Sequence, residues 1–243
     1  MVRNSASGGA RWMDVAPERF PGWVASFGRR HGADDGDQSL TTAATGSTVT
    51  FTAPDGAVAE CHPPFPPVEA GEPGGGEARL AAEAVAAHAR RPRTVGVLLV
   101  RLGGYAAGVF TGYPPALADA KTGSRLVHGR SAAGGWSQHR FARRREKQVS
   151  EALQAAASAA ADVFGRRGGK GGRYGRPGET LDAVVLGGDK RAMAELRQDP
   201  RLAPYLAIAT DRFLTVPDPR RAVLETTPRL FLAVRIRLTE PTP

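Results

Sequence analysis

The sequence predicts an α/β protein in which helices flank a mixed β-sheet. Thr94 to Arg101 is an almost continuous apolar run, which indicates a central and buried strand. Gln138 to Phe164 contains neither proline nor glycine and indicates one long helix. Leu181 to Leu186 indicates a second buried strand. Strands that alternate with helices in this way are typical of the α/β fold class.

The first part of the chain predicts a small α+β unit over residues 11–62. Pro17 to His31 carries aromatic residues at helical spacing, which favours an amphipathic helix. Ser47 to Ala53 and Ala57 to His62 are β-branched and alternating, and the Pro-Asp-Gly between them predicts a hairpin. Residues 63–76 are rich in Pro, Gly and Glu and predict a linker.

Residues 77–240 predict the larger α/β domain. We expect Leu80 and Val85 to face inward from its first helix, and Asp189 to cap a later one. The first helix is expected at Glu77–Arg90 and the helix capped by Asp189 runs to about Arg197. The other predicted elements are strands at Tyr105–Thr111 and Gly123–His128, a turn at Gly187-Gly188 and a closing strand at Phe231–Leu238.

The positive charge of the chain is concentrated in one window. The whole chain has 33 Lys and Arg against 24 Asp and Glu, for a net charge of +9. Between Lys121 and Arg176 there are 13 basic and three acidic residues, so this window carries +10 and the rest of the chain −1. A cluster of this kind is typical of a surface that binds nucleic acid.

Cysteine content and hydropathy exclude other classes of protein. The single cysteine, Cys61, excludes an intrachain disulfide and a multi-cysteine zinc site. The longest apolar run, Val95 to Val100, is too short to cross a bilayer, and residues 1–10 lack the apolar core of a signal peptide. We therefore expect a cytoplasmic protein without membrane contact.

The basic window surrounds a glycine loop. Gly134 and Gly135 allow backbone conformations and close approaches that a side chain would block. Gln138 follows them, and three consecutive arginines, residues 143–145, occupy the first turns of the predicted long helix. A loop with a flexible tip, a neutral amide and a guanidinium cluster is suited to catalysis inside RNA.

The motifs of this loop resemble the catalytic loop of the archaeal and eukaryotic class-one peptide release factors. That family has His-Gly-Arg, then Gly-Gly-Gln, then Arg-Phe-Ala-Arg. Here His128-Gly129-Arg130 and Arg140-Phe141-Ala142-Arg143 match, whereas Trp136-Ser137 separates the two glycines from Gln138. This stretched loop is similar to that of the Vms-like release factors, in particular the actinobacterial peptidyl-tRNA hydrolases of that branch.

The resemblance covers roughly residues 77–240 and implies a ribonuclease H-like, release-factor catalytic domain. It implies hydrolysis of the ester between a nascent peptide and tRNA, with Gln138, Gly134 and Gly135 as the catalytic residues and no cofactor. Glutamine has no useful pKa, so Gln138 would orient water by its side-chain amide and stabilise the oxyanion by its backbone N–H. The RNA would supply the proton acceptor.

The implied partners are the large ribosomal subunit, its 23S rRNA and stranded peptidyl-tRNA, bound by a monomer. Nothing in residues 1–76 resembles a codon-reading domain, so we expect release to be independent of a stop codon. Arg145 falls on the apolar side of the helix, and a structural role is equally open for it. The residues expected to contact RNA are Arg130, Trp136, Ser137, His139, Arg140, Arg143, Arg144, Arg145, Lys147, Arg166, Arg167, Lys170 and Arg173.

Two other functions stay open. A non-catalytic rescue factor would use the same basic surface to bind the ribosome without hydrolysis. A tRNA endonuclease would cut the tRNA; a metal-dependent one would need clustered carboxylates, for which Asp119, Asp182 and Asp189 are the candidates. The Gly-rich and Arg-rich run at 165–176 is expected to be a disordered loop that contacts RNA, and it lacks the spacing of a phosphate-binding P-loop.

Overall fold

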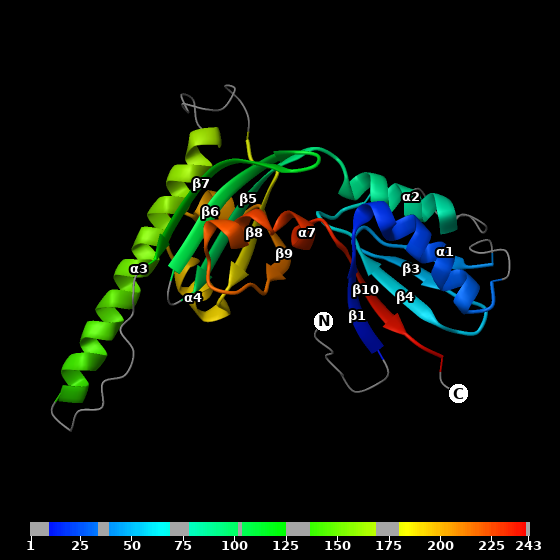
Figure 1. Cartoon of the computed structure of the whole chain (residues 1–243), viewed down its shortest axis with the longest axis horizontal. Coiled ribbons are helices and arrows are strands. Elements are labelled where there is room, and N and C mark those ends of the chain that lie inside the picture. The colour runs from blue at the N-terminus through cyan, green and yellow to red at the C-terminus, as the bar shows by residue number, and fades with distance from the viewer. Residues whose placement is uncertain are drawn as a thin grey trace. The chain divides into compact units, whose positions relative to one another are not determined.

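A computed structural model describes residues 10–33, 39–68, 78–101, 104–124, 137–168 and 180–241, and for residues 137–146 and 166–168 it describes the backbone alone. The chain divides into two compact units (Figure 1). The first unit combines Met1–Arg91 with Arg229–Pro243, and the second consists of Pro92–Pro228. None of the helices in the described ranges is both long and apolar enough to cross a bilayer.

The first unit contains a five-stranded antiparallel sheet with the strand order β1-β10-β4-β3-β2. The predicted hairpin is confirmed, because β3 and β4 pair with Val49 opposite Cys61 and Thr52 opposite Val58. The edge strands β1 and β2 were not predicted. The strands are β1 (Ala10–Val15), β2 (Thr41–Ala44), β3 (Val49–Thr52), β4 (Val58–His62) and β10 (Val234–Thr239).

Two helices pack against this sheet and close the first core. The predicted N-terminal helix is confirmed as a 3-10 turn, η1 (Pro17–Arg19), followed by α1 (Phe20–Arg30). The second helix is α2 (Ala78–Ala89). Fully buried side chains from α1, α2 and the strands form a single apolar cluster that includes Phe20, Phe27, Phe51, Val85 and Ile236.

The orientation predicted for α2 is half right. Val85 is buried as predicted, but Leu80 is 52% exposed. The buried stripe of α2 is made by Ala78, Ala82, Val85, Ala86 and Ala89. Leu80 lies two residues from Ala78 and from Ala82, which places it on the opposite side of a helix with 3.6 residues per turn.

The second unit contains a mixed five-stranded sheet with the order β7-β6-β5-β8-β9. The pairs β5–β6 and β6–β7 are antiparallel, whereas β5–β8 and β8–β9 are parallel. This mixed sheet confirms the predicted α/β fold. Its strands are β5 (Arg93–Arg101), β6 (Gly104–Gly112), β7 (Ala116–Ser124), β8 (Ala183–Gly188) and β9 (Ala209–Leu214).

The helices of the second unit form its core with the sheet. The predicted long helix is confirmed as α3 (Ser137–Gly168). It runs four residues past Phe164, so the prediction of a loop is wrong for residues 165–168, which are helical. Asp189 caps α4 (Lys190–Leu196) as predicted. Apolar side chains of α3 and α4 pack on Leu98, Val109 and Leu186 of the sheet. Shorter helices follow at α5 (Ala203–Leu206), α6 (Arg221–Glu225) and α7 (Pro228–Phe231), the last of which crosses the boundary between the units.

Several strand boundaries differ from the prediction. The third strand of the sheet, β7, occupies Ala116–Ser124 and not Gly123–His128, of which residues 125–128 lie outside the described part of the chain. Its sequence is Ala-Leu-Ala-Asp-Ala-Lys-Thr-Gly-Ser, which has weak strand propensity, and it is defined by its pairing with β6. Gly187 and Gly188, predicted as a turn, belong to β8.

The closing strand also lies elsewhere than expected. The predicted strand Phe231–Leu238 is observed as β10, and it pairs with β1 and β4 in the first unit's sheet. Its alternate residues Val234, Ile236 and Leu238 are fully buried in the first core. The observed units therefore differ from the expected ranges, since both α2 and β10 belong to the first unit.

Candidate nucleic-acid interface and catalytic loop

The helix α3 begins one residue before the predicted catalytic glutamine. Ser137 is its first residue, so Gln138 lies in its first turn. The first four N–H groups of an α-helix have no acceptor within the helix. The backbone N–H of Gln138 is one of these groups. Gly134 and Gly135, the other predicted catalytic residues, lie outside the described part of the chain.

The N-terminal half of α3 projects beyond the sheet of the second unit (Figure 1). The helix has 32 residues and is therefore about 48 Å long. Among its described side chains, those that are fully buried lie between Ala156 and Phe164, and none from Lys147 to Ala155 is buried. The helix thus carries the end that bears Gln138 away from the body of its unit.

Positive charge accumulates at this projecting end. The N-terminus of a helix carries a partial positive charge from its aligned peptide dipoles. The first turn of α3 has no acidic residue to offset that charge. The sequence instead adds Arg140, Arg143, Arg144 and Arg145 within the first three turns. The positive end of the helix dipole and the nearby arginines repel each other in the free helix, and a bound polyanion such as RNA would offset this repulsion.

The other predicted RNA-binding residues fall into three groups. Lys147 is described in full and is exposed. Arg130, Trp136, Lys170 and Arg173 lie outside the described part of the chain. For the rest the backbone alone is described, all of it in α3: Ser137, His139, Arg140, Arg143, Arg144, Arg145, Arg166 and Arg167.

The C-terminal half of α3 is anchored to its unit. Ala156, Ala160 and Val163 are fully buried. The ring of Phe164 packs edge-on against Tyr205 at 5.2 Å between centroids. It also lies over Gly96 of β5, where an added Cβ would be only 3.0 Å from the Phe164 ring. The glycine lets the helix approach the strand closely.

Two polar contacts on the surface add to this anchor. Arg201 donates a hydrogen bond to Ser158 Oγ at 2.7 Å, and Lys121 of β7 donates to the Asp162 carboxylate at 3.0 Å. Both ends of the Lys121–Asp162 pair are about half exposed, so its contribution to stability is small. Lys121 is one of the basic residues in the charged window, and its charge is used within the protein.

A cavity of about 260 Å³ lies where α3 passes the ends of three strands. Its lining is mostly apolar and includes Val100, Tyr105, Val149 and Leu153. An added Cβ at Gly123 would lie 2.5 Å from the Tyr105 ring, so the glycine makes room for this ring against β7. Ser124, the last described residue before the catalytic loop, also lines the cavity. No sequence motif indicated it, because its lining comes from five separate elements.

The carboxylates considered for a metal site have structural roles where their contacts are described. Asp182 Oδ2 accepts a hydrogen bond from the Thr94 backbone N–H at 2.6 Å and links the start of β5 to β8. Asp189 Oδ1 accepts from the backbone N–H groups of Arg191 and Ala192 at 2.7 and 3.0 Å. In the described ranges, no group of three or more His, Cys, Asp or Glu side chains is arranged to hold a metal ion.

Comparison with solved structures finds similarity to an archaeal translation termination factor. The crystal structure of that factor, aRF1, matches with a TM-score of 0.40 and 14% sequence identity, covering 92% of this chain and 67% of the other. A second structure, described as an archaeal protein, matches with a TM-score of 0.27 and 14% identity, covering 91% of this chain and 64% of the other. No curated protein sequence matches this chain.

Comparison with protein families gives a direct assignment. The model of the Actinobacteria/chloroflexi VLRF1 release factor family, acVLRF1, matches residues 93–237, which is more than half of the chain. The matched region holds the mixed sheet and the whole of α3 with its glutamine and arginines. A release factor acts in translation termination or rescue and interacts with the ribosome and tRNA. The chain belongs to the Actinobacteria/chloroflexi VLRF1 release factor family.

Proposed function

We propose that this protein hydrolyses peptidyl-tRNA stranded on large ribosomal subunits, without a stop codon. The observation that carries the proposal is the position of Gln138 in a chain of the release-factor family. This glutamine stands in the first turn of a helix that projects from its unit and bears four arginines near its start. A long, rigid and positively charged arm is suited to deliver a catalytic loop into a site enclosed by RNA.

The proposed reaction is the attack of water on the ester carbonyl between the peptide and the terminal ribose of tRNA. The new bond joins the water oxygen to the carbonyl carbon, and the ester bond to the ribose oxygen breaks. The side-chain amide of Gln138 orients the water, and its backbone N–H stabilises the negative charge that develops on the carbonyl oxygen. An RNA group accepts the proton from water, and the ribose oxygen leaves protonated.

The proposed partner is the 23S rRNA of the large subunit together with the tRNA. The positive end of the α3 dipole and the arginine side chains of its first turns would face phosphates of this RNA. These contacts position the loop, whereas Gln138 acts on the reacting atoms. Binding and release therefore depend on different residues.

The test uses purified large subunits, free of mRNA, that carry a labelled nascent peptidyl-tRNA. We expect the wild type to release free peptide and leave the tRNA intact. The Gln138→Ala variant should release peptide about 10²–10³ times more slowly if one positioned donor is lost. Gln154→Ala is the matched control, since Gln154 lies on the same helix and is exposed.

The rival functions predict different products. If the protein is a rescue factor without hydrolysis, the wild type binds the subunits and the peptidyl-tRNA stays whole. If it is a tRNA endonuclease, the peptide stays attached to a tRNA fragment. Equal release by the wild type and by Gln138→Ala would remove the side-chain amide of Gln138 from the mechanism and leave only its backbone N–H.

A further inference from the structure

In the described part of the first unit, the helices α1 and α2 pack on one face of the sheet, and no described helix of this unit packs on the other. The inward residues of its strands pack with α1 and α2 in the first core, and the alternate residues point to the other face. Residues that pair across antiparallel strands share a face of the sheet. The register therefore places Trp12, Arg237 and Glu60 in one row on this open face and Asp14, Arg235 and His62 in the next.

An exposed tryptophan is fixed in place on this face. The guanidinium carbon of Arg235 lies 4.6 Å from the centroid of the Trp12 ring, which is a cation–π contact. The His62 ring lies 5.4 Å from the same ring at an angle of 41°. Trp12 nevertheless remains 45% exposed. The two contacts hold the indole in one orientation on the sheet and leave a large part of it open to solvent.

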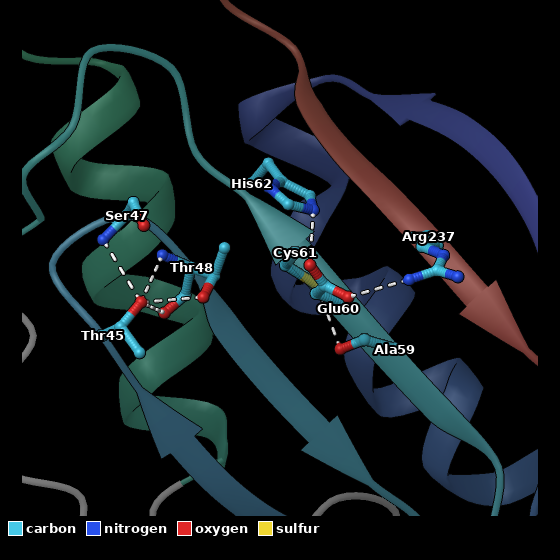
Figure 2. Close-up of polar contacts among 8 residues, drawn as sticks. All are labelled: Thr45, Ser47, Thr48, Ala59, Glu60, Cys61, His62 and Arg237. Carbon is cyan, nitrogen blue, oxygen red and sulfur yellow. Dashed lines mark hydrogen bonds and ion pairs between the residues drawn. The ribbon is translucent and has the colours of Figure 1, made fainter.

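Glu60, His62 and Arg237 form a polar cluster on this face (Figure 2). Glu60 Oε1 lies 3.0 Å from His62 Nε2, and Glu60 Oε2 lies 3.7 Å from Arg237 Nη1. The Arg237 side chain is still 50% exposed. A guanidinium has five N–H donors, so Arg237 keeps donors that can bind a further acceptor. In the register Arg237 stands between Glu60 and Trp12, so it is next to both of them on the open face.

We propose that this open face, defined by Trp12, Arg235, Arg237 and His62, binds single-stranded RNA. Aromatic side chains on a sheet stack on unpaired bases, and neighbouring arginines bind the phosphates between them. In this arrangement a base stacks on the exposed part of the Trp12 ring, and Arg235 and Arg237 contact the adjoining phosphates. A duplex is a poor ligand, because its bases are stacked on one another and unavailable to Trp12.

Because its charges are balanced, the face favours binding of a single strand by stacking over nonspecific electrostatic attraction to RNA. Asp14 and Glu60 stand opposite Arg235 and Arg237 in the register, so the four side chains sum to no net charge. A surface of this kind binds through stacking and a few phosphate contacts, and its affinity depends weakly on salt. The arginine-rich end of α3 differs, because its excess positive charge makes binding to RNA depend strongly on salt. The inference does not depend on hydrolysis by Gln138.

Trp12 differs from the other exposed apolar residues among those described. Leu80 is 52% and Ile208 39% exposed. Isolated exposed apolar side chains are ordinary on a protein surface. Trp12 stands out because a guanidinium and an imidazole hold its ring on the sheet, with a second guanidinium in its row. Leu80 belongs to the same unit and is therefore a suitable control.

The test measures binding of the full chain to a fluorescein-labelled single-stranded RNA of about ten nucleotides by anisotropy. We expect Trp12→Ala to raise the Kd roughly 5- to 100-fold, since stacking of a base is lost. Trp12→Phe keeps an aromatic ring and should stay within about threefold of the wild type. Leu80→Ala should leave the Kd unchanged. A thermal melt of each variant establishes that the first unit is folded.

Photocrosslinking separates this surface from the arginines of α3. With thiouridine-labelled RNA of the same sequence, we expect crosslinked peptides from β1 and β10 in the wild type and their loss in Trp12→Ala. Crosslinks confined to α3, or an unchanged Kd in folded Trp12→Ala, would overturn the proposal. So would equally tight binding of duplex RNA that depends on Trp12 to the same extent.

Discussion

Asp189 fixes the start of α4 through one carboxylate oxygen. Its hydrogen bonds from the N–H groups of Ala192 and Arg191 hold the pKa of this carboxyl below its ordinary value of 3.8. A group with a lowered folded pKa stabilises the fold above its unfolded pKa, and that stability is lost as pH falls through the folded pKa. The contribution of the Asp189 cap is therefore complete at neutral pH and is lost below about pH 4.

This cap gives a prediction for stability. Asp189→Ala should lower the free energy of unfolding of the second unit by about 1 kcal/mol at pH 7, because an N-cap side chain is lost. Asp189→Asn should cost little at pH 7, and the loss of stability below about pH 4 should be smaller in it than in the wild type. Denaturant melts at pH 7 and pH 3 measure both effects. The control, Asp211→Ala, changes an exposed aspartate of β9; a cost as large there would remove the cap explanation.

Gly188 is required because β8 passes close to β5 at this residue. Its φ is +102°, and an added Cβ would collide with the Val100 carbonyl group. Gly56 has a φ of +89° with nothing within 4 Å of an added Cβ. We expect Gly56→Ala to cost about 1–2 kcal/mol from the backbone conformation alone. Gly188→Ala should cost more, because the collision adds to that strain. Equal costs in denaturant melts would show that the backbone around Gly188 relaxes.

At the scale of elements, the sequence predicted those with a strong local pattern. The buried strands β5 and β8, the hairpin of β3 and β4, and the helices α1 and α3 follow from apolar runs, periodicity and turn residues. The strands β1, β2 and β9 were missed. β1 is stabilised by β10, which is more than 200 residues away in the chain, so nothing in its neighbourhood indicates it. The RNA-binding face around Trp12 was missed for the same reason.

The candidate site was predictable in part. The motifs of the glycine loop and of the first turns of α3 are local in sequence, so they could be recognised without a structure. The projection of α3 beyond its sheet could not, because it depends on where the packing of Ala156 to Phe164 begins. The cavity beside Tyr105 depends on the lack of a side chain at Gly123, which is informative only once β6 and β7 are paired.

The projecting end of α3 predicts a salt-dependent role for its arginines. Arg143→Ala/Arg144→Ala should weaken binding to large subunits, and the slope of log K against log salt should fall by about 1.5 if both contact phosphates. Arg19→Ala/Arg29→Ala removes the same charge from exposed positions of the first unit and should change neither quantity. Binding measured over a range of salt concentrations tests this. Equal losses in the two variants would indicate an effect of overall charge and not of α3.

At the scale of the whole molecule, Cys61 is a natural reporter of the first unit. It is the single cysteine of the chain, it is fully buried, and burial raises the pKa of its thiol. Its reaction with a thiol reagent therefore requires the first unit to open. Ile236→Ala in β10 removes fully buried apolar volume beside Cys61 and should cost about 2–5 kcal/mol. Cys61 should react much faster in this variant.

Leu98→Ala is the matched variant in the second unit, where Leu98 is 1% exposed. If the two units unfold independently, Leu98→Ala lowers stability but leaves the Cys61 labelling rate unchanged. Faster labelling in Leu98→Ala would show that the units unfold together. This outcome bears on the RNA-binding tests, because it decides whether damage to one unit reaches the surface of the other.

The two proposed surfaces lie in different units and should affect release in different ways. In a titration of large subunits, Gln138→Ala should lower the maximal rate of peptide release and leave the half-saturating concentration nearly unchanged, because the glutamine acts in the transition state. If the RNA strand that Trp12 binds belongs to the subunit, Trp12→Ala should raise the half-saturating concentration and leave the maximal rate unchanged, since only binding is lost. A lower maximal rate in folded Trp12→Ala would mean that the first unit helps to position the catalytic loop.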